Sequence, residues 1–410
     1  MSKLLQIAVE ANKGSVGRIA EQIGETILEN GWSSYIAYAR ESNPSKSQTI
    51  KIGSKFDVYR HGLETRIFDN HCFSSRNATK NLIKKIDKIK PDIIHLHHLH
   101  GYFINIEILF NYLKESKIPI VWTFHDCWSF TGHCAYFDFV GCNKWKTECY
   151  NCEQRMEYPK SLILDRSRKN FSDKNRLFNS IHNMTIVPVS NWLSDNVKES
   201  FLKKYPCKVI HNGIDLDTFH IKKSRTLIDD TYKVKSKFVI LGVASTWDRR
   251  KGLDEFVKLN DLIDKQLYVI ILIGLNESQI KMIPNTIIGI QRTENVSQLA
   301  DLYSAADVFV NPTLEDTFPT TNLESLACGT PVITYKTGGS IESVNNDTGI
   351  VVEKGDVCGL LNAIEHVKSQ GKHFYENNCR ESAIKNFDRK IKFNDYHELY
   401  KNILKNIDEE

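Results

Sequence analysis

The stretch EDTFPTTNLESLACGTPVI, residues 315–333, combines residue types suited to binding a phosphorylated sugar. Its two acids, Asp316 and Glu324, are eight residues apart. Between Thr317 and Leu323 lie an aromatic ring, a proline, two further hydroxyls and an amide: Phe318, Pro319, Thr320, Thr321 and Asn322. The apolar run DVFVNP just before predicts a strand, so we expect these residues at the carboxyl end of that strand.

We expect a short helix over residues 322–327, with Thr320 or Thr321 as its N-cap. The first N–H groups of a helix have no intrahelical partner and the helix dipole is positive there, which favours a phosphate. Asp316 before the helix and Glu324 within it offer carboxylate oxygens to hydroxyl groups on either side of that phosphate. The alternative is a capped helix with Glu324 placed favourably near its N-terminus, which does not account for Asp316.

Strand-like and helix-like segments alternate along the whole chain, which predicts parallel α/β layers. A chain of 410 residues exceeds one ordinary core, so we expect two domains. We expect strands at 4–9, 33–39, 92–97, 118–124, 184–190, 208–212, 237–245, 267–274, 286–291, 307–312 and 330–335. A charged stretch with little periodicity, 216–236, is interpreted as a linker, and residues 79–90 predict an amphipathic helix. In such doubly wound sheets ligands bind at the carboxyl ends of strands.

The composition is that of a soluble globular protein, with 41% hydrophobic and 25% charged residues. No apolar run approaches eighteen residues, and the first residues lack the pattern of a signal peptide, so we expect a cytoplasmic protein with reduced cysteines. Residues 1–215 carry 30 Lys and Arg against 22 Asp and Glu, whereas the remainder carries 24 against 28. A basic first half suggests an anionic partner, and a solvated basic surface is the alternative.

The acid-flanked stretch resembles the signature of retaining GT-B glycosyltransferases of family 4. Phe318, Glu324, Gly329 and Pro331 stand in register with that pattern, while Asp316 replaces its first Glu. Three further stretches resemble family motifs: the glycine loop NKGSVGRIAEQI, the segment HNGID and the basic loop GVASTWDRRKG. In these stretches the resemblance implies that the donor is bound by Gly14, Ser15, Gly17, Arg250 and Lys251.

The resemblance implies an α/β GT-B fold, with two Rossmann-like domains of doubly wound parallel sheets facing across a cleft. The acceptor-side domain would span 1–215 and the nucleotide-sugar-binding domain 237–388, and a C-terminal helix in 389–410 would return to the first domain. The implied reaction moves a hexosyl or N-acetylhexosaminyl group from a nucleotide-diphosphate-sugar to a hydroxyl of a glycan or lipid-linked glycan, with retention and no required catalytic metal. The implied setting is bacterial surface polysaccharide synthesis.

By the same resemblance, Lys251, Arg250 and helix amides would stabilise the departing diphosphate. Glu324 would bind the ribose, and Asp316 would bind the donor sugar. His125, in TFHD, matches a family histidine that hydrogen-bonds to the sugar.

Half of the ten cysteines fall in residues 127–152, an insertion that resembles one found in bacterial family members. Four of them, Cys134, Cys142, Cys149 and Cys152, end in a C-x-x-C pair that is typical of a structural zinc site. Apolar packing of the thiols and disulfides are the alternatives. The histidines of the run HLHHLHG, residues 95–101, could bind a metal. Because the run holds no acidic residue, packing at the strand end or contact with the acceptor is the preferred interpretation.

Two other functions compete with glycosyl transfer. One is a nucleotide-sugar epimerase of the same fold, and the other is a zinc-bearing nucleic-acid or interaction module, which would leave the acidic stretch unexplained. The partners we expect are the donor and the acceptor, together with contact between the lysine-rich helix and an anionic inner membrane face, but no nucleic acid.

Overall fold

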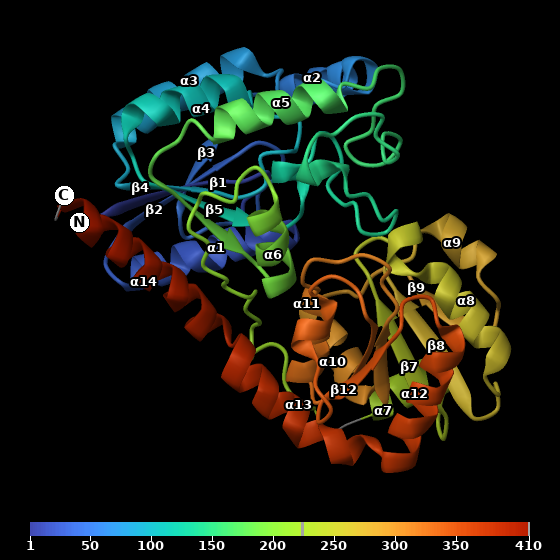
Figure 1. Cartoon of the computed structure of the whole chain (residues 1–410). Helices are drawn as coiled ribbons and strands as arrows, with labels where there is room; N and C mark the ends of the chain where they lie inside the picture. The colour runs from blue at the N-terminus through green and yellow to red at the C-terminus, as the bar shows by residue number, and fades with distance from the viewer. Residues whose placement is uncertain (223–224, 409–410) are drawn as a thin grey trace. The chain divides into compact units, whose positions relative to one another are not determined.

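The computed structural model describes residues 1–222 and 225–408, which form two compact units (Figure 1). Unit 1 comprises Met1–His211 and Lys392–Glu410, and unit 2 comprises Asn212–Ile391. Each unit contains one six-stranded parallel sheet with helices on both faces. Both sheets are doubly wound: the chain adds strands outward on one side of the first strand and then on its other side. Ligands bind at this switch point in such sheets.

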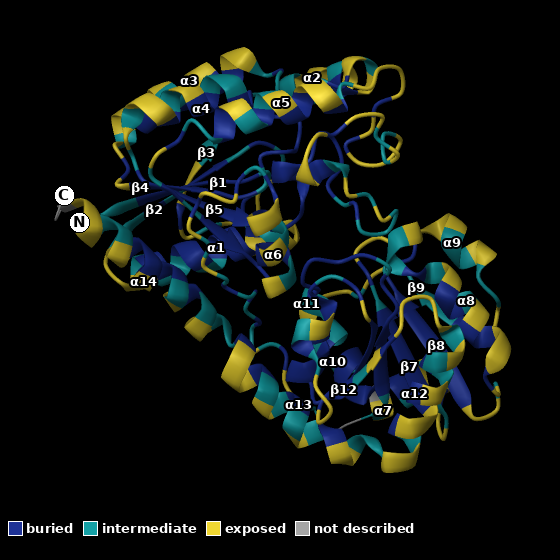
Figure 2. Ribbon diagram, viewed as in Figure 1, coloured by how far each residue is buried: buried dark blue, intermediate teal, exposed yellow. Residues whose placement is uncertain are grey.

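The sheet of unit 1 has the order β3-β2-β1-β4-β5-β6. Its strands are β1 (Lys3–Ile7), β2 (Ser33–Tyr38), β3 (Gln48–Lys51), β4 (Ile93–Leu96), β5 (Ile120–Phe124) and β6 (Met184–Pro188). The central strands are buried on both faces, as expected for parallel strands covered by helices (Figure 2). Residues 208–212, expected to be a strand, contribute no strand, and only Cys207 just before them forms a bridge, with Ile186.

The helices of unit 1 each carry both buried and exposed residues (Figure 2). They are α1 (Gly14–Glu29), α2 (Lys55–Phe68), α3 (Arg76–Ile89), α4 (Ile106–Ser116), α5 (Ser167–Phe178) and α6 (Asn191–Glu199), with short 3₁₀ turns η1 (Trp128–Phe130) and η2 (Lys144–Lys146). The amphipathic helix expected at 79–90 is α3, and Leu82 and Ile86 on its apolar side are buried. In Figure 1, α3, α4 and α5 cover one face of the sheet, and α1 lies on the other.

The C-terminal helix α14 (Arg389–Asp408) completes the core of unit 1 from the α1 side. Phe393, Tyr396 and Tyr400 pack in one cluster with apolar residues of α1, β1, β4, β5 and β6. The hydroxyl of Tyr400 lies 2.7 Å from Nδ1 of His95 in β4, although the two residues are 305 positions apart. The last helix of the chain is therefore part of the first unit.

The sheet of unit 2 has the order β12-β11-β10-β7-β8-β9. Its strands are β7 (Phe238–Val243), β8 (Tyr268–Ile273), β9 (Ile287–Ile290), β10 (Val308–Asn311), β11 (Val332–Tyr335) and β12 (Gly349–Val352). Its helices are α7 (Thr226–Tyr232), α8 (Leu253–Leu262), α9 (Glu277–Met282), α10 (Val296–Ala305), α11 (Thr320–Ala327), α12 (Val357–Gln370) and α13 (Lys372–Phe387), with 3₁₀ turns η3 (Arg249–Lys251) and η4 (Ser340–Ser343). In Figure 1, α8 and α12 lie on one face, and α10 and α11 lie on the other.

The stretch expected to be a linker, 216–236, belongs to unit 2 instead. Phe219, Ile228 and Val234 are buried, and Arg225 forms ion pairs with Asp229 and Asp307. Its few apolar residues are widely spaced among charged ones, so the sequence gives no periodic sign of this packing. Residues 223–224 of this stretch and residues 409–410 of the terminal segment lie outside the described residues.

Candidate functional site

The acid-flanked stretch of unit 2 follows β10 and leads into α11, as its sequence predicts. The helix begins at Thr320, two residues earlier than expected, and its N-cap is Pro319 rather than Thr320 or Thr321. No side chain caps the helix from that position, because proline carries no side-chain acceptor. The helix N-terminus therefore lacks the usual side-chain cap and keeps the positive end of its dipole.

Asp316 forms an ion pair with Lys251, which ends the 3₁₀ turn η3. Burial would raise the pKa of Asp316, but the charges of Lys251 and Arg250 and hydrogen bonds to the carboxylate lower it below its usual value. Arg250 lies beside them and donates from Nη1 to the carbonyl oxygen of Glu315 at 2.9 Å. The two basic residues and the first acid of the motif thus meet in one place.

Glu324 is half-buried on α11, and its Oε2 accepts a hydrogen bond from the hydroxyl of Tyr303 at 2.9 Å. Tyr303 is fully buried on α10, and burial together with the charge of Glu324 raises the pKa of its hydroxyl well above the usual value. The hydroxyl consequently stays protonated and fixes one oxygen of Glu324. Sequence reasoning missed Tyr303, because a buried tyrosine 21 residues before its partner carries no local signal.

Three residues expected to bind the donor are instead buried in unit 2. Asn322 is fully buried: its Oδ1 accepts from Asn311 at 2.8 Å, and its Nδ2 donates to Ser343 at 3.0 Å. Phe318 is 3% exposed, with its ring 5.9 Å from that of Phe387, and Pro319 is buried as well. A buried amide must find partners inside the protein, so Asn322 joins β10, α11 and η4 rather than facing a ligand.

In unit 1 the candidate residues lie around a cavity of 300 Å³ at the carboxyl ends of the central strands. Ser15 and Gly17 line it, together with Glu10 and Arg40. Gly14 has a φ of +66°, and a Cβ on Gly17 would lie 2.9 Å from the carbonyl oxygen of Glu10. The glycines therefore let the start of α1 approach the end of β1 closely.

His125 follows β5 and is buried in a row of histidine rings. Gln6 donates to Ala20, which leaves its Oε1 to accept from Nε2 of His97 at 3.0 Å. Nδ1 of His97 then accepts from Nε2 of His125 at 3.1 Å, so this chain of bonds sets the tautomer of His125. Burial holds the pKa of His125 well below its usual value, and the ring is neutral at pH 7.

The histidine run after β4 contains no acidic residue, but Asp126, just after the neighbouring strand β5, lies beside it. Its Oδ2 lies 2.7 Å from Nε2 of His100 and 3.3 Å from Nε2 of His98. Sequence reasoning missed this group because parallel strands align positions that are distant in the chain.

The cysteines expected to bind zinc are free thiols, so the disulfide alternative is not seen in the structure. The thiol of Cys134 donates a hydrogen bond to the sulfur of Cys152, and this contact lowers the pKa of Cys152 below its usual value. Nearby, His133 places Nδ1 2.6 Å from Asp69, while its buried Nε2 has no partner. Thiolates and imidazoles are ligands that Zn²⁺ prefers, but in the described part of the chain these cysteines and His133 do not bring three ligand atoms within 4.8 Å of one another. The full set Cys134, Cys142, Cys149 and Cys152 stays a prediction.

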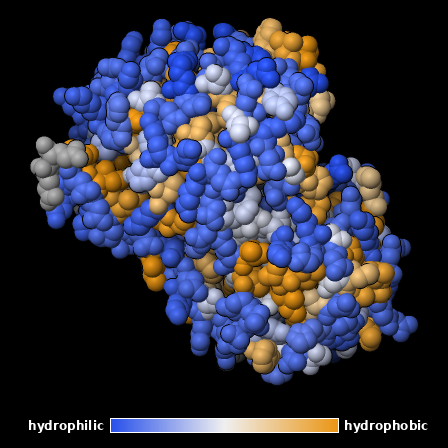
Figure 3. All heavy atoms as spheres, viewed as in Figure 1, coloured by the Kyte–Doolittle hydropathy of each residue, from blue (hydrophilic) through white to orange (hydrophobic). Residues whose placement is uncertain are grey.

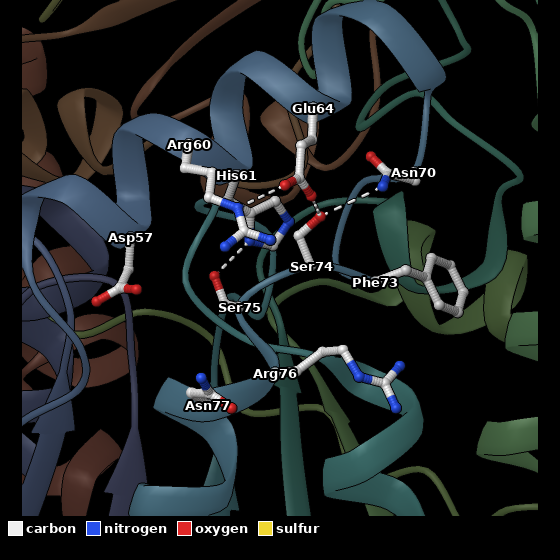
Figure 4. A pocket seen from close by; sticks show the side chains of 10 residues that line it. All are labelled: Asp57, Arg60, His61, Glu64, Asn70, Phe73, Ser74, Ser75, Arg76 and Asn77. Carbon is white, nitrogen blue, oxygen red and sulfur yellow. Dashed lines mark hydrogen bonds and ion pairs between the residues drawn. The ribbon is translucent and has the colours of Figure 1, made fainter.

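A second cavity in unit 1, of 240 Å³, lies between α2 and the start of α3 (Figure 4). Its polar side chains bond to one another: Arg60 to Glu64 at 2.6 Å, and Nδ1 of His61 to Ser75 at 2.8 Å. These four side chains are bonded within the protein, whereas Oδ1 of Asn70 in the same lining has no hydrogen-bond partner. None of the expected site residues lines this cavity. Separately, none of the helices in the described ranges is long and apolar enough to span a bilayer.

Two sequence profiles match the chain. The profile for Glycosyltransferase Family 4 matches residues 16–218, and the profile for Glycosyl transferases group 1 matches residues 237–370. The chain is 24% identical over 379 residues to the putative colanic acid biosynthesis glycosyl transferase WcaC of Escherichia coli (strain K12), covering 87% of this chain and 89% of that protein.

One further related protein and one solved structure carry a nucleotide sugar in their names. The UDP-Gal:alpha-D-GlcNAc-diphosphoundecaprenol alpha-1,3-galactosyltransferase of Escherichia coli is 24% identical over 223 residues, covering 51% of this chain and 58% of that protein. The crystal structure of HepE from Anabaena in complex with UDP-glucose superposes with a TM-score of 0.66 at 14% identity, covering 98% of this chain and 100% of that one.

These findings agree with the two doubly wound sheets and with the motif at the start of α11. The protein belongs to the family 4 glycosyltransferases of GT-B fold.

Proposed function

We propose that this glycosyltransferase moves a hexosyl or N-acetylhexosaminyl group from a UDP-sugar to a hydroxyl of a glycan or lipid-linked glycan, with retention of configuration. The observation that carries the donor assignment is the meeting of Lys251, Arg250 and Asp316 in the unit that holds the α11 N-terminus and Glu324. The UDP named for HepE and for the galactosyltransferase supports the choice of base, and the diphosphoundecaprenol of the latter supports a lipid-linked acceptor.

The donor diphosphate would lie at the N-terminus of α11, where N–H groups and the helix dipole favour an anion. Lys251 and Arg250 would neutralise the charge that grows on the diphosphate as the sugar leaves. A preorganised hydrogen-bond donor or cation that is aimed at such charge typically lowers the activation free energy by about 3–4 kcal/mol. Glu324, held by Tyr303, would accept hydrogen bonds from the ribose hydroxyls, and Asp316 would accept from the donor sugar.

Retention requires the acceptor to attack from the face that the diphosphate leaves. The bond from the anomeric carbon to the phosphate oxygen breaks with its electron pair on that oxygen, and the acceptor oxygen bonds to the same carbon. The departing phosphate oxygen takes the acceptor proton, so atoms and charge balance. Neutral His125 would hydrogen-bond to a sugar hydroxyl, and Gly14, Ser15 and Gly17 would let backbone approach the bound sugars.

We further propose that unit 1 contacts an anionic membrane surface through an apolar patch rather than through the lysine-rich helix α3. The patch consists of exposed side chains of α2 and of the loop paired with its end: Phe56, Tyr59, Leu63, Phe68, Leu162, Ile163 and Leu164. The backbone N–H of Leu162 donates to the carbonyl of Arg66 at 2.7 Å, which joins the loop to the helix. Figure 3 shows hydrophobic side chains gathered over the end of α2.

The charge of this patch favours a lipid surface over a soluble protein partner. Lys55 lies on α2 among the exposed rings and Lys160 is exposed just before the loop, whereas Arg60 is paired with Glu64. Apolar side chains beside cations suit the headgroup boundary of an anionic bilayer. The apolar side of α3, by contrast, is buried against the protein, which leaves only lysines for a membrane.

The test is a transfer assay with a panel of UDP-sugars and an undecaprenyl-diphosphate-linked sugar. We expect one UDP-sugar to give an extended lipid-linked product whose new linkage, read by NMR, has the donor's anomeric configuration. Inversion would overturn the retaining assignment. An altered nucleotide sugar formed without any acceptor would instead establish the epimerase.

A further inference from the structure

We propose that His98, His100 and Asp126 form a binding site for a divalent transition-metal ion such as Zn²⁺. The site lies in unit 1, at the carboxyl ends of β4 and β5, and does not depend on the proposed transfer reaction. It also differs from the expected cysteine site in its ligands, which are two imidazoles and one carboxylate.

Sheet register explains why these three side chains meet. β4 and β5 are parallel neighbours, with Leu96 opposite Trp122, so the chain just beyond both strands emerges at the same edge. His98 and His100 are two residues apart after β4, and Asp126 is two residues beyond the end of β5. One nitrogen from each ring and one carboxylate oxygen all lie within 4.8 Å of one another. Ligands of one tetrahedral or octahedral ion are separated by distances of this order.

The nitrogens that would face the ion contact the carboxylate of Asp126 and, among the described residues, nothing else that could accept or donate a hydrogen bond. Nε2 of His98 and Nε2 of His100 are buried, and neither has a hydrogen-bond partner. The carboxylate of Asp126 is as close as 2.7 Å, yet it does not lie where a ring N–H would point. Two ring nitrogens and a carboxylate oxygen that lie close together without aligned N–H···O bonds resemble the ligands around one central metal ion.

The opposite atoms of two of these side chains are held by the protein. Nδ1 of His100 lies 3.2 Å from the hydroxyl of Tyr158, which leaves Nε2 as the nitrogen that faces Asp126. Oδ1 of Asp126 accepts from the backbone N–H of Trp128 at 3.0 Å, which leaves Oδ2 for the cluster. Metal-binding histidines and carboxylates are commonly oriented by such outer hydrogen bonds.

The cluster opens onto the cavity of 300 Å³, which both histidines line. Three protein ligands with an accessible side leave at least one coordination position for water or an oxygen of a bound molecule. Arg40 and Glu10 both line the same cavity, so it offers a cation and a carboxylate to a molecule bound at that position. Two imidazoles and a carboxylate favour Zn²⁺ or a neighbouring first-row ion over Mg²⁺ or Ca²⁺.

The experiment is a Co²⁺ titration of the full chain after removal of metals with a chelator. Thiolate-bound Co²⁺ adds an intense near-ultraviolet charge-transfer band, whereas a site of two histidines and an aspartate gives visible bands alone. The variants are His98→Ala, His100→Ala and Cys152→Ser, with His366→Ala on the exposed side of α12 as the matched control. Circular dichroism and thermal melting verify the fold of each variant.

We expect visible bands that saturate at one Co²⁺ for this site and disappear when Zn²⁺ displaces the Co²⁺. The bands should remain in Cys152→Ser and in His366→Ala. His98→Ala should weaken the binding by at least about 10-fold. His98 is the less buried histidine, so its variant keeps the test decisive even if His100→Ala fails to fold. The proposal is overturned if Co²⁺ gives no visible bands, or if the bands are unchanged in folded His98→Ala.

Discussion

Lys251 and Asp316 form an ion pair although they are 65 positions apart in the sequence. Lys251 ends the turn after β7, and Asp316 follows β10, which is the neighbouring strand in the sheet. The pair stands where the sheet order reverses, which is the place where doubly wound folds bind ligands. Without a donor the pair neutralises two charges, and with a donor it would present a cation to the diphosphate and an acceptor to the sugar.

The first prediction separates the two roles of this pair. Lys251→Met should lower kcat by about 100- to 1000-fold, because it removes a charge aimed at the leaving diphosphate. It should also lower the melting temperature, because Asp316 is left buried without its cation. The double variant Lys251→Met/Asp316→Asn should recover the melting temperature but not the activity. Lys281→Ala on exposed α9 is the control, and full activity of folded Lys251→Met would contradict the assignment.

The second prediction concerns Tyr303, which touches Glu324 but no expected ligand atom. Tyr303→Phe keeps the ring and removes one hydrogen bond of about 1 kcal/mol, so KM for the donor should rise about 5-fold with little change in kcat. Steady-state kinetics over a range of donor concentrations measure the two parameters. Tyr150→Phe, on an exposed ring, should change neither. An unchanged KM in folded Tyr303→Phe would show that Glu324 needs no such support.

The third prediction uses Lys372 at the start of α13, whose Nζ donates to the carbonyl oxygen of Ala306 at 2.8 Å. Burial lowers the pKa of Lys372 from 10.5 to about 8, so the folded protein releases this proton more easily than the unfolded chain. Between pH 8 and 10.5 the unfolded state binds more protons, and stability from this group must rise with pH, by up to about 1.4 kcal/mol per pH unit.

Lys372→Met removes this titration. Urea unfolding at several pH values should therefore give a free-energy difference, wild type minus variant, that rises between pH 8 and 10.5 and is flat below pH 7. Subtracting the variant cancels the other groups that titrate in alkali. A difference that stays constant with pH would show that Lys372 titrates alike in both states.

The fourth prediction tests the apolar patch of unit 1. Phe56→Ser and Ile163→Ser remove side chains that are 70% and 63% exposed, so they should leave the fold intact. Binding to vesicles that contain phosphatidylglycerol, measured by cosedimentation, should fall several-fold in each variant and further in the double variant. Met282→Ser, which removes an 82% exposed side chain from unit 2, is the matched control. Equal binding by all variants, or equal binding to neutral vesicles, would argue against the surface.

The sequence was sufficient for the alternation of strands and helices, because apolar runs and amphipathic spacing are local properties. The helix α3 and the strand before the acidic motif appear where their patterns place them. Capping was less predictable: hydroxyls at Thr320 and Thr321 suggested an N-cap, yet the helix already includes both. The N-cap position falls on Pro319, one residue before the two hydroxyls, so neither threonine can act as the cap.

The parts of the site that sequence reasoning missed depend on contacts between distant segments. Asp126 completes the histidine cluster only because β4 and β5 are adjacent in the sheet. Tyr303 supports Glu324 from another helix. The side chain of Asn322 is occupied by hydrogen bonds to Asn311 and Ser343. Residue type and spacing find groups that are close in the chain, whereas the contacts made by the fold decide which distant groups meet.

The most direct test of the account is calorimetric titration of the full chain with UDP, GDP and ADP, alongside Glu324→Gln and the control Glu277→Gln on exposed α9. We predict that wild type and control bind UDP alike, and that Glu324→Gln weakens UDP binding by at least about 10-fold while its melting temperature stays close to that of wild type. Equal UDP affinity in folded Glu324→Gln, or a wild-type protein that binds none of the three nucleotides, would contradict the donor site at α11.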